Sequence, residues 1–383
     1  MRHLLVLTCV LVLFSACARK KDYGRPLPPG TPALVELRPG EWPRFRLPTA
    51  AELPGIAEAI DRSLHYLAKK SAKKYFPMNG IGHDQVVRGL TTFKEVLRLA
   101  RTEDQLNGML TRDFRCFRSV GWDGSGEVLF TGYYTPIFQA RLEPDRVFRY
   151  PIYQLPADLR KGATHNDVAT QVLPGGGTRP YPGRAELERT GALRGLELAW
   201  LADPFDAYII NVQGSARLVL GDGRTLEVGY AGTNGHRYVS VNHALVKDGR
   251  IGEDECNLAT MRAFFRRHPQ LVAGYINRNQ RLVFFKPAPG GPFGCLGEKV
   301  TDHVSMATDK DIFPRAALCY VIEAREPKTG RRGGYAGFRL DQDRGGAIVA
   351  PGRADLFMGI GEHAERVAGR KYSEGYLFYL VAK

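Results

Sequence analysis

The sequence predicts a mainly β protein with two β-rich regions and a few peripheral helices. Glycine (43 residues) and proline (24 residues) are plentiful, and both residues interrupt regular elements and favour a loop-rich β architecture. The expected elements also run in a clear order: helices first, a β-rich middle, one helix and a β-rich end. The chain is long enough for two domains of ordinary size, each with its own core.

Three helices are expected before the first β-rich region. Apolar residues recur at helical spacing over 53–68 and predict the first helix. The segment Thr92-Phe93-Lys94-Glu95 matches a capping box and predicts the start of a second helix. A third helix is expected over 103–114.

Strand character begins at 127–134, where β-branched and aromatic residues follow one another. Short strands separated by glycine and proline are then expected, the clearest at 149–153, 206–212 and 237–240. The stretch 174–181 is rich in such breakers and predicts a loop.

One later helix is expected over about 253–267, ending before Pro269. Three strong apolar strands follow it, at 282–285, 316–322 and 376–381. The pattern alone does not indicate how the two β-rich regions connect.

The N-terminal residues are typical of a targeting segment. An apolar run over 4–14 is too short to span a membrane, and small residues then precede Cys17. We interpret 1–16 as a lipoprotein signal peptide and Cys17 as the acylated N-terminus; an ordinary cleavage site is the alternative. Residues 17–50 would then form a Pro-rich, semi-rigid tether. Because Ala18 follows Cys17, the usual lipoprotein sorting rule predicts a lipid anchor on the periplasmic face of the outer membrane.

The formal net charge of +14 at pH 7 implies an acidic partner. An anionic cell-wall polymer or an anionic lipid surface suits a secreted lipoprotein, whereas nucleic acid does not. The basic residues are scattered along the chain, so an ordinary solvated surface is an equally good interpretation.

Four cysteines lie beyond the N-terminal segment, and their spacing leaves all three full disulfide pairings open: Cys116, Cys256, Cys295 and Cys319. Apolar or aromatic neighbours favour buried free thiols at Cys116 and Cys319. No Cys or His spacing indicates zinc, and neither a metal nor another cofactor is expected.

The strongest candidate for chemistry is the segment that starts at Asp341. Asp343 precedes two glycines, and Asp355 stands inside an apolar run. A carboxyl in such surroundings is a candidate for a raised pKa, because desolvation disfavours its charged form. A carboxylic acid that is protonated near neutral pH can act as a general acid. Asp341 is interpreted as a solvated neighbour, and Asp309 before Lys310 has the pattern of a surface turn.

Two polar segments could bind a ligand, and the side chains of the first are of a kind that suits sugars. Adjacent tyrosines in 130–136 lie beside glycine and threonine and offer stacking faces and hydroxyls; a strand end with core aromatics is the alternative. In 211–216, Gln213 and Ser215 are candidates for hydrogen bonds to a ligand. Asp222-Gly223 predicts an ordinary hairpin turn.

Several common catalytic motifs are absent from the sequence. It contains no GxSxG, HExxH or GxxxxGK[ST] pattern. The GxGxxA pattern at 359–364 has no surrounding βαβ unit, and Asp343-Arg344-Gly345 differs from the Asp-Thr/Ser-Gly of aspartic proteases. The motifs therefore give no support to serine hydrolases, zinc proteases or nucleotide-binding enzymes.

Taken together, these segments resemble the membrane-bound lytic murein transglycosylase A family. The resemblance rests on ordered motifs along the chain: FTGYYTP at 130–136, VQGS at 212–215, YAGTNGH at 230–236, VFFKP at 283–287, GGAI at 345–348 and DLFMGIG at 355–361. It implies a double-psi β-barrel domain, a second β-barrel domain inserted into it, and a groove between the two. The first domain would comprise 51–132 and 286–383, and the insert would comprise 133–285.

The reaction implied by this resemblance is cleavage of the β-1,4 bond between N-acetylmuramic acid and N-acetylglucosamine in peptidoglycan, with formation of 1,6-anhydromuramic acid. By the same resemblance, Asp355 is the general acid and base, and Asp343 and Asp309 are supporting acids. The expected substrate-binding residues are Thr131, Tyr133, Gln213, Gly214 and Ser215. The alternatives are a non-catalytic peptidoglycan-binding protein on the same fold and a hydrolase of another polysaccharide.

The chain departs from the family pattern at three places. Arg344 stands where a small or apolar residue is usual, and turned inward it would lower the pKa of neighbouring carboxyls. Ala216 replaces a glycine, and 293–305 fits the family poorly. The sequence does not distinguish endo from exo cleavage. It indicates no peptide-stem preference and no protein partner.

Overall fold

The computed structural model describes residues 21–164, 167–253, 255, 257–325 and 334–383. The predicted signal peptide, Cys17 and Cys256 lie outside these residues. Within them, no helix is both long enough and apolar enough to cross a membrane.

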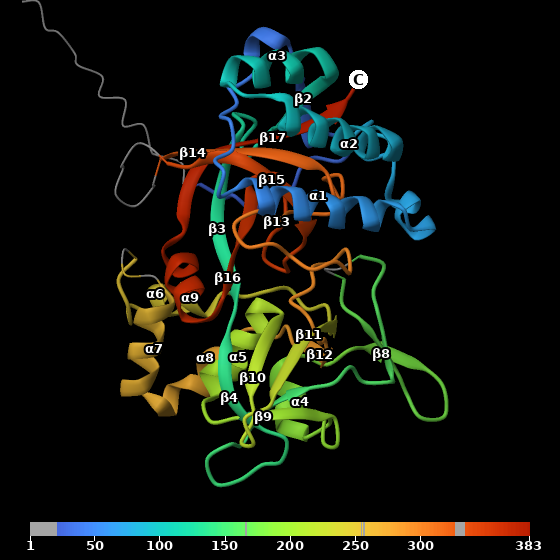
Figure 1. The fold of residues 1–383 in the computed structure, drawn as a ribbon. Helices are drawn as coiled ribbons and strands as arrows, with labels where there is room; N and C mark the ends of the chain where they lie inside the picture. The colour runs from blue at the N-terminus through green and yellow to red at the C-terminus, as the bar shows by residue number, and fades with distance from the viewer. Residues whose placement is uncertain (1–20, 165–166, 254, 256, 326–333) are drawn as a thin grey trace, which may run out of the picture.

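The larger of two main sheets has eight strands and forms the upper body in Figure 1. Its pairings run from β17 through β14, β15, β13, β16 and β3 and then return to β17. β1 and β2 extend this sheet beyond β17. The strand bounds are β1 (Leu34–Leu37), β2 (Phe114–Ser119), β3 (Glu127–Thr135), β13 (Ser305–Ala307), β14 (Leu318–Arg325), β15 (Ala336–Asp343), β16 (Arg353–Ile360) and β17 (Tyr372–Ala382).

Helices cover this sheet because their apolar faces need a partner. α1 (Leu53–Leu67) packs against β15, α2 (His83–Leu99) packs against β17, and α9 (Gly361–Arg370) packs on β3 and β16. α3 (Glu103–Asp113) lies beside α2. A Cβ on Gly89 of α2 would lie 3.2 Å from the backbone nitrogen of Ala382, so glycine allows this close approach.

The predicted helices at 53–68 and 103–114 are confirmed, but the predicted start of the second helix is wrong. α2 begins at His83, where the Gln85 side chain accepts a hydrogen bond from the Gly82 backbone N–H at 2.8 Å. Thr92 and Glu95 lie in the middle of this helix. Its buried apolar positions continue at helical spacing past Thr92, and this packing outweighs the local capping pattern.

The second main sheet has six strands and forms the lower body in Figure 1, with the strand order β12-β11-β10-β4-β9-β5. Its strands are β4 (Ile137–Arg141), β5 (Tyr150–Tyr153), β9 (Glu197–Leu201), β10 (Ser215–Val219), β11 (Thr225–Thr233) and β12 (Val283–Pro287). A small third sheet contains β6 (Leu159–Arg160), β7 (Thr170–Val172) and β8 (Thr178–Pro180). The lower body also holds α4 (Arg184–Thr190), α5 (Pro204–Gln213), α6 (Val241–Lys247), α7 (Leu258–Arg267) and α8 (Val272–Ile276).

Short 3₁₀ helices complete the description: η1 (Pro39–Glu41), η2 (Lys70–Tyr75) and η3 (Pro269–Leu271). The strands predicted at 127–134, 149–153, 282–285, 316–322 and 376–381 all correspond to observed strands. The Asp222-Gly223 hairpin turn is also found, between β10 and β11.

Three predictions for the middle of the chain are wrong. Residues 206–212 are helical in α5, because Asp203 caps its N-terminus through a 2.7 Å bond from the Phe205 N–H and Pro204 suits its first turn. Residues 237–240 lie outside any strand and lead into α6. The predicted loop at 174–181 includes β8, which pairs with β7.

The helix predicted at about 253–267 is shorter than expected. α7 begins at Leu258, where the Asn257 side chain accepts the Thr260 N–H at 3.0 Å. Cys116, Cys295 and Cys319 are free thiols, and Cys116 and Cys319 are buried as predicted. Burial raises the pKa of the Cys116 thiol to about 12, which is typical of an inert structural cysteine.

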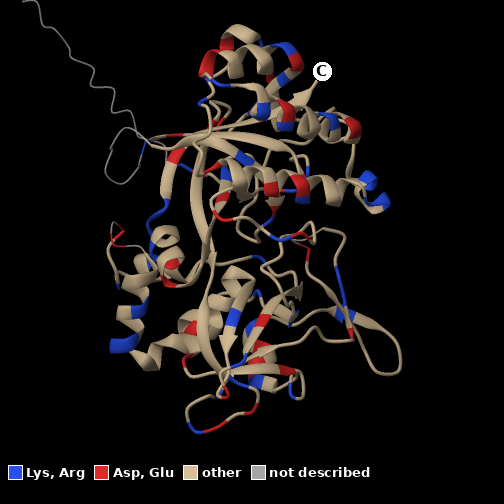
Figure 2. Ribbon diagram, viewed as in Figure 1, with Lys and Arg blue, Asp and Glu red and all other residues tan. Residues whose placement is uncertain are grey.

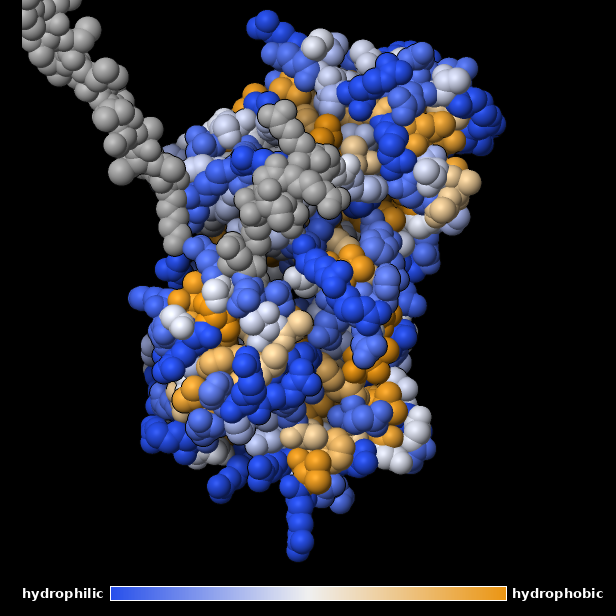
Figure 3. Space-filling model, turned by 90° about the vertical axis from the view of Figure 1, so that its left-hand side faces the viewer, coloured by the Kyte–Doolittle hydropathy of each residue, from blue (hydrophilic) through white to orange (hydrophobic). Residues whose placement is uncertain are grey.

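The charges of the chain are spread over both bodies, with acidic residues among the basic ones (Figure 2). On the face seen in Figure 3, hydrophobic residues form separate small patches within a mostly hydrophilic surface. This distribution agrees with the scattered basic residues of the sequence.

Candidate active site

The predicted acid Asp355 lies on β16, between β3 and β13. Its neighbours Ala354 and Leu356 point into the main apolar core, so the alternating side chains Arg353 and Asp355 lie on the opposite face. In the parallel pairing with β3, Asp355 is opposite Thr131. The strand pattern thus places a carboxyl and a hydroxyl side by side.

Burial raises the pKa of Asp355 to about 6, and the Arg353 cation and a hydrogen bond from the Thr131 hydroxyl oppose this rise. Oδ1 of Asp355 is buried and has no hydrogen-bond partner among the described residues. A carboxyl with a pKa near 6 and one unengaged oxygen is suited to give and take a proton near neutral pH.

Asp343 lies at the end of β15 and accepts three hydrogen bonds. Oδ1 accepts the backbone N–H groups of Cys295 and Arg344, both at 2.8 Å, and Oδ2 accepts the Tyr133 hydroxyl at 2.9 Å. Burial raises the pKa of Asp343, and these three donors oppose the rise. Asp343 is therefore more tightly held than Asp355.

Ala307 on β13 connects the two acids, since it pairs with Asp343 on one side and with Asp355 on the other. Tyr133 packs its ring against Phe357 of β16, with centroids 5.2 Å apart. Thr131 and Tyr133, both predicted for the site, are thus brought to Asp355 and Asp343 respectively.

Asp309 contacts the loop that precedes β16. Its Oδ2 accepts the backbone N–H of Ala350 at 2.9 Å, and its Oδ1 accepts that of Asp311 at 3.1 Å. Ala350 has a φ of 68°, in the left-handed region that non-glycine residues rarely adopt. Asp309 therefore holds a strained loop in place.

The interpretation of Asp341 as a solvated neighbour is wrong. The turn predicted at Asp309 is found, since its carbonyl accepts the backbone N–H groups of Ile312 and Phe313, but Lys310 is buried rather than at the surface. The exposed fraction of Asp341 is 0% and that of Lys310 is 1%, and the two form an ion pair. Asp341 also accepts the hydroxyls of Thr308 and Tyr379, both at 2.8 Å. A carboxylate so deeply buried requires such partners.

Arg344 does not turn toward the acids as its position in the sequence suggested. Its guanidinium bonds Asp311 at 3.2 Å, and its backbone N–H is what contacts Asp343. The cation beside Asp355 is Arg353, which the sequence reasoning missed. The alternation Arg353-Ala354-Asp355 on a predicted strand would have placed both side chains on one face.

Gln213, Gly214 and Ser215 join the two bodies where α5 meets β10. The Gln213 side chain accepts the Tyr134 backbone N–H at 3.0 Å, and the Ser215 hydroxyl bonds that of Thr135 at 3.0 Å. Gly214 ends α5 with a φ of 78°, which glycine adopts without strain. These residues contact β3 next to Thr131 and Tyr133, and no contact with Asp355 is found for them.

A pocket of about 150 Å³ lies beside this junction, between β3 and the helices of the lower body. It is lined by Gly132, Gln213 and Tyr238 together with apolar residues of α5, α7 and α9. Tyr238 also lies close enough to Asp355 for the carboxylate to raise its pKa, although burial is the larger cause. The segment before α6 therefore approaches the acid from the lower body.

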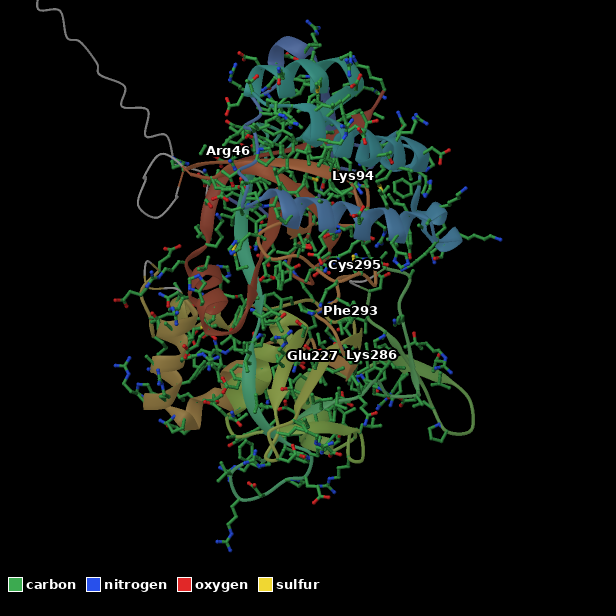
Figure 4. All side chains as sticks on the ribbon, in the orientation of Figure 1. Arg46, Lys94, Glu227, Lys286, Phe293 and Cys295 are labelled. Carbon is green, nitrogen blue, oxygen red and sulfur yellow. The ribbon has the colours of Figure 1, made fainter. Side chains whose placement is uncertain are left out.

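The segment between β12 and β13 passes between the two bodies, as the labelled Phe293 and Cys295 in Figure 4 show. Its Cys295 N–H is one of the donors to Asp343. The Phe293 side chain is 43% exposed, which is unusual for an aromatic ring. The described residues contain no group of three or more His, Cys, Asp or Glu side chains placed to hold a metal ion.

Comparison with known proteins identifies the family of this chain. The family model described as the MltA specific insert domain matches residues 129–286, and the 3D domain model matches residues 304–381. The membrane-bound lytic murein transglycosylase A of Escherichia coli K12 is 31% identical over 269 residues, which cover 68% of each chain. This chain belongs to the membrane-bound lytic murein transglycosylase A family.

A second relative with that name, from Vibrio cholerae, is 31% identical over 257 residues. That alignment covers 65% of this chain and 64% of the relative, so about two thirds of the curated relatives' length is matched. The crystal structure of E. coli MltA with bound chitohexaose has a TM-score of 0.69 and 23% identity to this chain. It covers 94% of this chain and 96% of that protein, which shows that the transglycosylase A fold extends over nearly the whole molecule.

Proposed function

We propose that this protein is a lytic transglycosylase that cleaves the β-1,4 bond between N-acetylmuramic acid and N-acetylglucosamine in peptidoglycan and forms 1,6-anhydromuramic acid. The observation that carries the proposal is the contrast between the two acids at the site. Asp355 has a free buried oxygen and a pKa of about 6, whereas both oxygens of Asp343 already accept protein donors.

One available carboxyl suits a lytic reaction better than hydrolysis. Glycoside hydrolases generally need two carboxyls, one as acid and one as base or nucleophile. In the lytic reaction the protonated Asp355 gives its proton to the glycosidic oxygen as the C1–O bond breaks. The C6 hydroxyl of the muramic residue then attacks C1 and closes the anhydro ring, and the Asp355 carboxylate takes the C6 hydroxyl proton. No water is consumed.

The neighbouring residues take supporting roles in this proposal. Asp343 and Tyr133 form a fixed pair beside the acid, and Asp309 holds the loop before β16 through Ala350. Thr131 and Tyr133 would line the glycan groove directly. Gln213, Gly214 and Ser215 would shape its wall where the two bodies meet.

The relatives support the substrate class. Their names describe a murein enzyme, and the E. coli structure holds chitohexaose. We therefore propose that this chain binds a β-1,4-linked glycan strand of peptidoglycan. The net charge of +14 is favourable for approach to an anionic wall polymer.

We further propose the finer architecture and location. Residues 51–132 and 286–383 would form a double-psi β-barrel, which the returning strand pairings support, and 133–285 would form the inserted barrel domain. Cys17 would carry the lipid that anchors the protein to the periplasmic face of the outer membrane. The tether would be shorter than 17–50, because Lys21 pairs with Glu127 at 2.5 Å and with Glu374 at 2.6 Å, and β1 joins the upper sheet.

Mass spectrometry of digested sacculi tests the function. The wild-type protein should release muropeptides that end in 1,6-anhydromuramic acid. Asp355→Asn should lower the rate by about 10²- to 10⁴-fold, the usual contribution of a general acid, while the variant still pellets with sacculi. Asp222→Asn, in an exposed hairpin turn, is the matched control.

Two outcomes would overturn the proposal. If the wild-type protein pellets with sacculi but releases no soluble muropeptide, the protein is a binding module. If the products have reducing ends, the reaction is hydrolysis and an activated water must take part.

A further inference from the structure

Arg353 stands out among the residues around Asp355, because it lies on the same face of the same strand. We propose that Arg353 is a positioning residue that acts through Thr131: it holds the threonine hydroxyl so that this hydroxyl donates to one oxygen of Asp355 and leaves Oδ1 for the glycan. The inference rests on the proposed function and refines the site that carries it.

The strand pairing brings the three side chains together. β16 and β3 are parallel, with Arg353 opposite Leu129 and Asp355 opposite Thr131. Residues two apart on a strand share a face, so Arg353, Asp355 and Thr131 project from the sheet on one side. The Nη2 of Arg353 lies 3.2 Å from the Oγ1 of Thr131.

The hydrogen-bond roles then follow from the donors available. A guanidinium can only donate, so Thr131 Oγ1 accepts from Arg353 and keeps its single hydroxyl proton for another acceptor. The acceptor that we infer for this proton is the carboxyl of Asp355, which lies opposite Thr131 in the strand pairing. Oδ1 has no partner among the described residues, so in this proposal Thr131 donates to Oδ2 and the transferable proton resides on Oδ1.

Arg353 differs in charge from the other titratable groups that face Asp355. They are Arg353 on β16, Asp343 on β15, Tyr133 on β3 and Tyr238 from the lower body. Arg353 is the cation of this group and favours the carboxylate, whereas burial and Asp343 disfavour it. Arg344 is occupied by Asp311. Arg353 thus keeps Asp355 able to return to the carboxylate and accept the C6 hydroxyl proton.

The Nε atom of Arg353 is a further feature of this side chain. It is buried and has no hydrogen-bond partner among the described residues. Buried donors without partners are rare in folded proteins, and they need an explanation where they occur. Arg118, Arg315 and Arg339 share this feature, so the free Nε is compatible with a role at the site but does not distinguish Arg353.

The pH dependence of kcat on purified glycan strands tests the proposal. Activity requires protonated Asp355, so its pKa sets the alkaline limb of the profile. Arg353→Gln should lower kcat about tenfold and move this limb upward by about one pH unit, with KM changed less than about twofold. Arg353→Lys keeps the charge and should leave the limb in place. Arg366→Gln, on the exposed face of α9, is the control for loss of an arginine.

A double-mutant cycle tests whether Arg353 works through Thr131. Thr131→Val should lower kcat and raise the limb in the wild-type background, but it should have little further effect in Arg353→Gln. Fully multiplicative effects would show that the two residues act separately and would overturn the inference. A large rise in KM with an unmoved limb would also overturn it, because Arg353 would then bind substrate directly.

A titration that needs no turnover separates this inference from the proposed function. The Asp355 carboxyl can be followed by NMR in protein labelled with [γ-¹³C]aspartate, with Asp355→Asn to identify its signal. Its titration midpoint should move upward in Arg353→Gln; an unchanged midpoint would overturn the inference. Absence of anhydro products from the wild-type protein would instead refute the proposed function and would leave this titration interpretable.

Discussion

Asp341 and Asp343 lie two residues apart on β15, yet the protein treats them in opposite ways. Asp341 is enclosed with Lys310 and with two hydroxyl groups, so its charge is balanced inside the core. Asp343 is surrounded by neutral donors, and burial raises its pKa. The comparison teaches that the partners of a buried carboxyl decide its surroundings: Asp341 is paired with a buried cation, whereas Asp343 accepts only neutral donors.

Removing the cation that pairs with Asp341 should have the largest effect on the free energy of unfolding. Lys310→Met leaves Asp341 buried without its cation and should cost about 3–5 kcal/mol, measured by urea denaturation at pH 7. The matched control is Lys94→Met, which removes an exposed ion pair with Asp61 worth about 0–1 kcal/mol. Equal losses in the two variants would contradict the assignment of Asp341 and Lys310 as a structural pair.

Neutralising Asp355 should change the free energy of unfolding in the opposite direction. The pKa of Asp355 is raised to about 6 from 3.8, so the folded state favours its protonated form and loses stability as pH rises from about 4 through 6. Asp355→Asn should therefore be more stable than the wild type at pH 8 by about 1–3 kcal/mol. The gain should shrink as pH falls toward 4, and a gain that is independent of pH would argue against the raised pKa.

Removing a donor from Asp343 should have a smaller effect. Tyr133→Phe deletes the hydrogen bond to Oδ2 and should cost about 0.5–1.5 kcal/mol at pH 8, measured by thermal denaturation. Because this donor favours the carboxylate, the pKa of Asp343 should rise further in the variant. Tyr376→Phe, at a more exposed tyrosine of β17, serves as the control. No difference between the two variants would show that the Asp343 contact is unimportant.

The smallest effect is expected at Arg344. Arg344→Ala removes only a partly exposed pair with Asp311 and should change the free energy of unfolding by less than about 1 kcal/mol. The alkaline limb of the kcat profile should stay in place, unlike that of Arg353→Gln. A moved limb would mean that Arg344 turns toward the acids in solution.

Local patterns predicted most strands, and they singled out Asp355 as a buried carboxyl with a raised pKa. β3 and β17 have the alternation and residue types of strands, and Asp355 stands out as a polar residue in an apolar run. The family resemblance then distinguished Asp355 from Asp343. Each of these predictions depends on a pattern within a few neighbouring residues.

The errors arose where the deciding contact is distant in the sequence. Asp341 looked exposed because its partners Lys310 and Tyr379 come from other elements. The run 206–212 is rich in β-branched and aromatic residues, but the Asp203 cap and packing in the lower body make it helical. Arg353 was missed because its importance depends on Thr131 of a neighbouring strand.

The single residue Pro136 separates β3 of the upper sheet from β4 of the lower sheet. Proline fixes its own φ, and the Tyr134–Gln213 and Thr135–Ser215 hydrogen bonds fasten the adjoining strand. This junction is therefore a rigid connection between the two bodies. The segment that carries Phe293 and Cys295 is a second connection, with the Gly290 N–H bonded to Glu227 of the lower body and the Cys295 N–H bonded to Asp343 of the upper body. The two bodies are therefore fastened at two separate places.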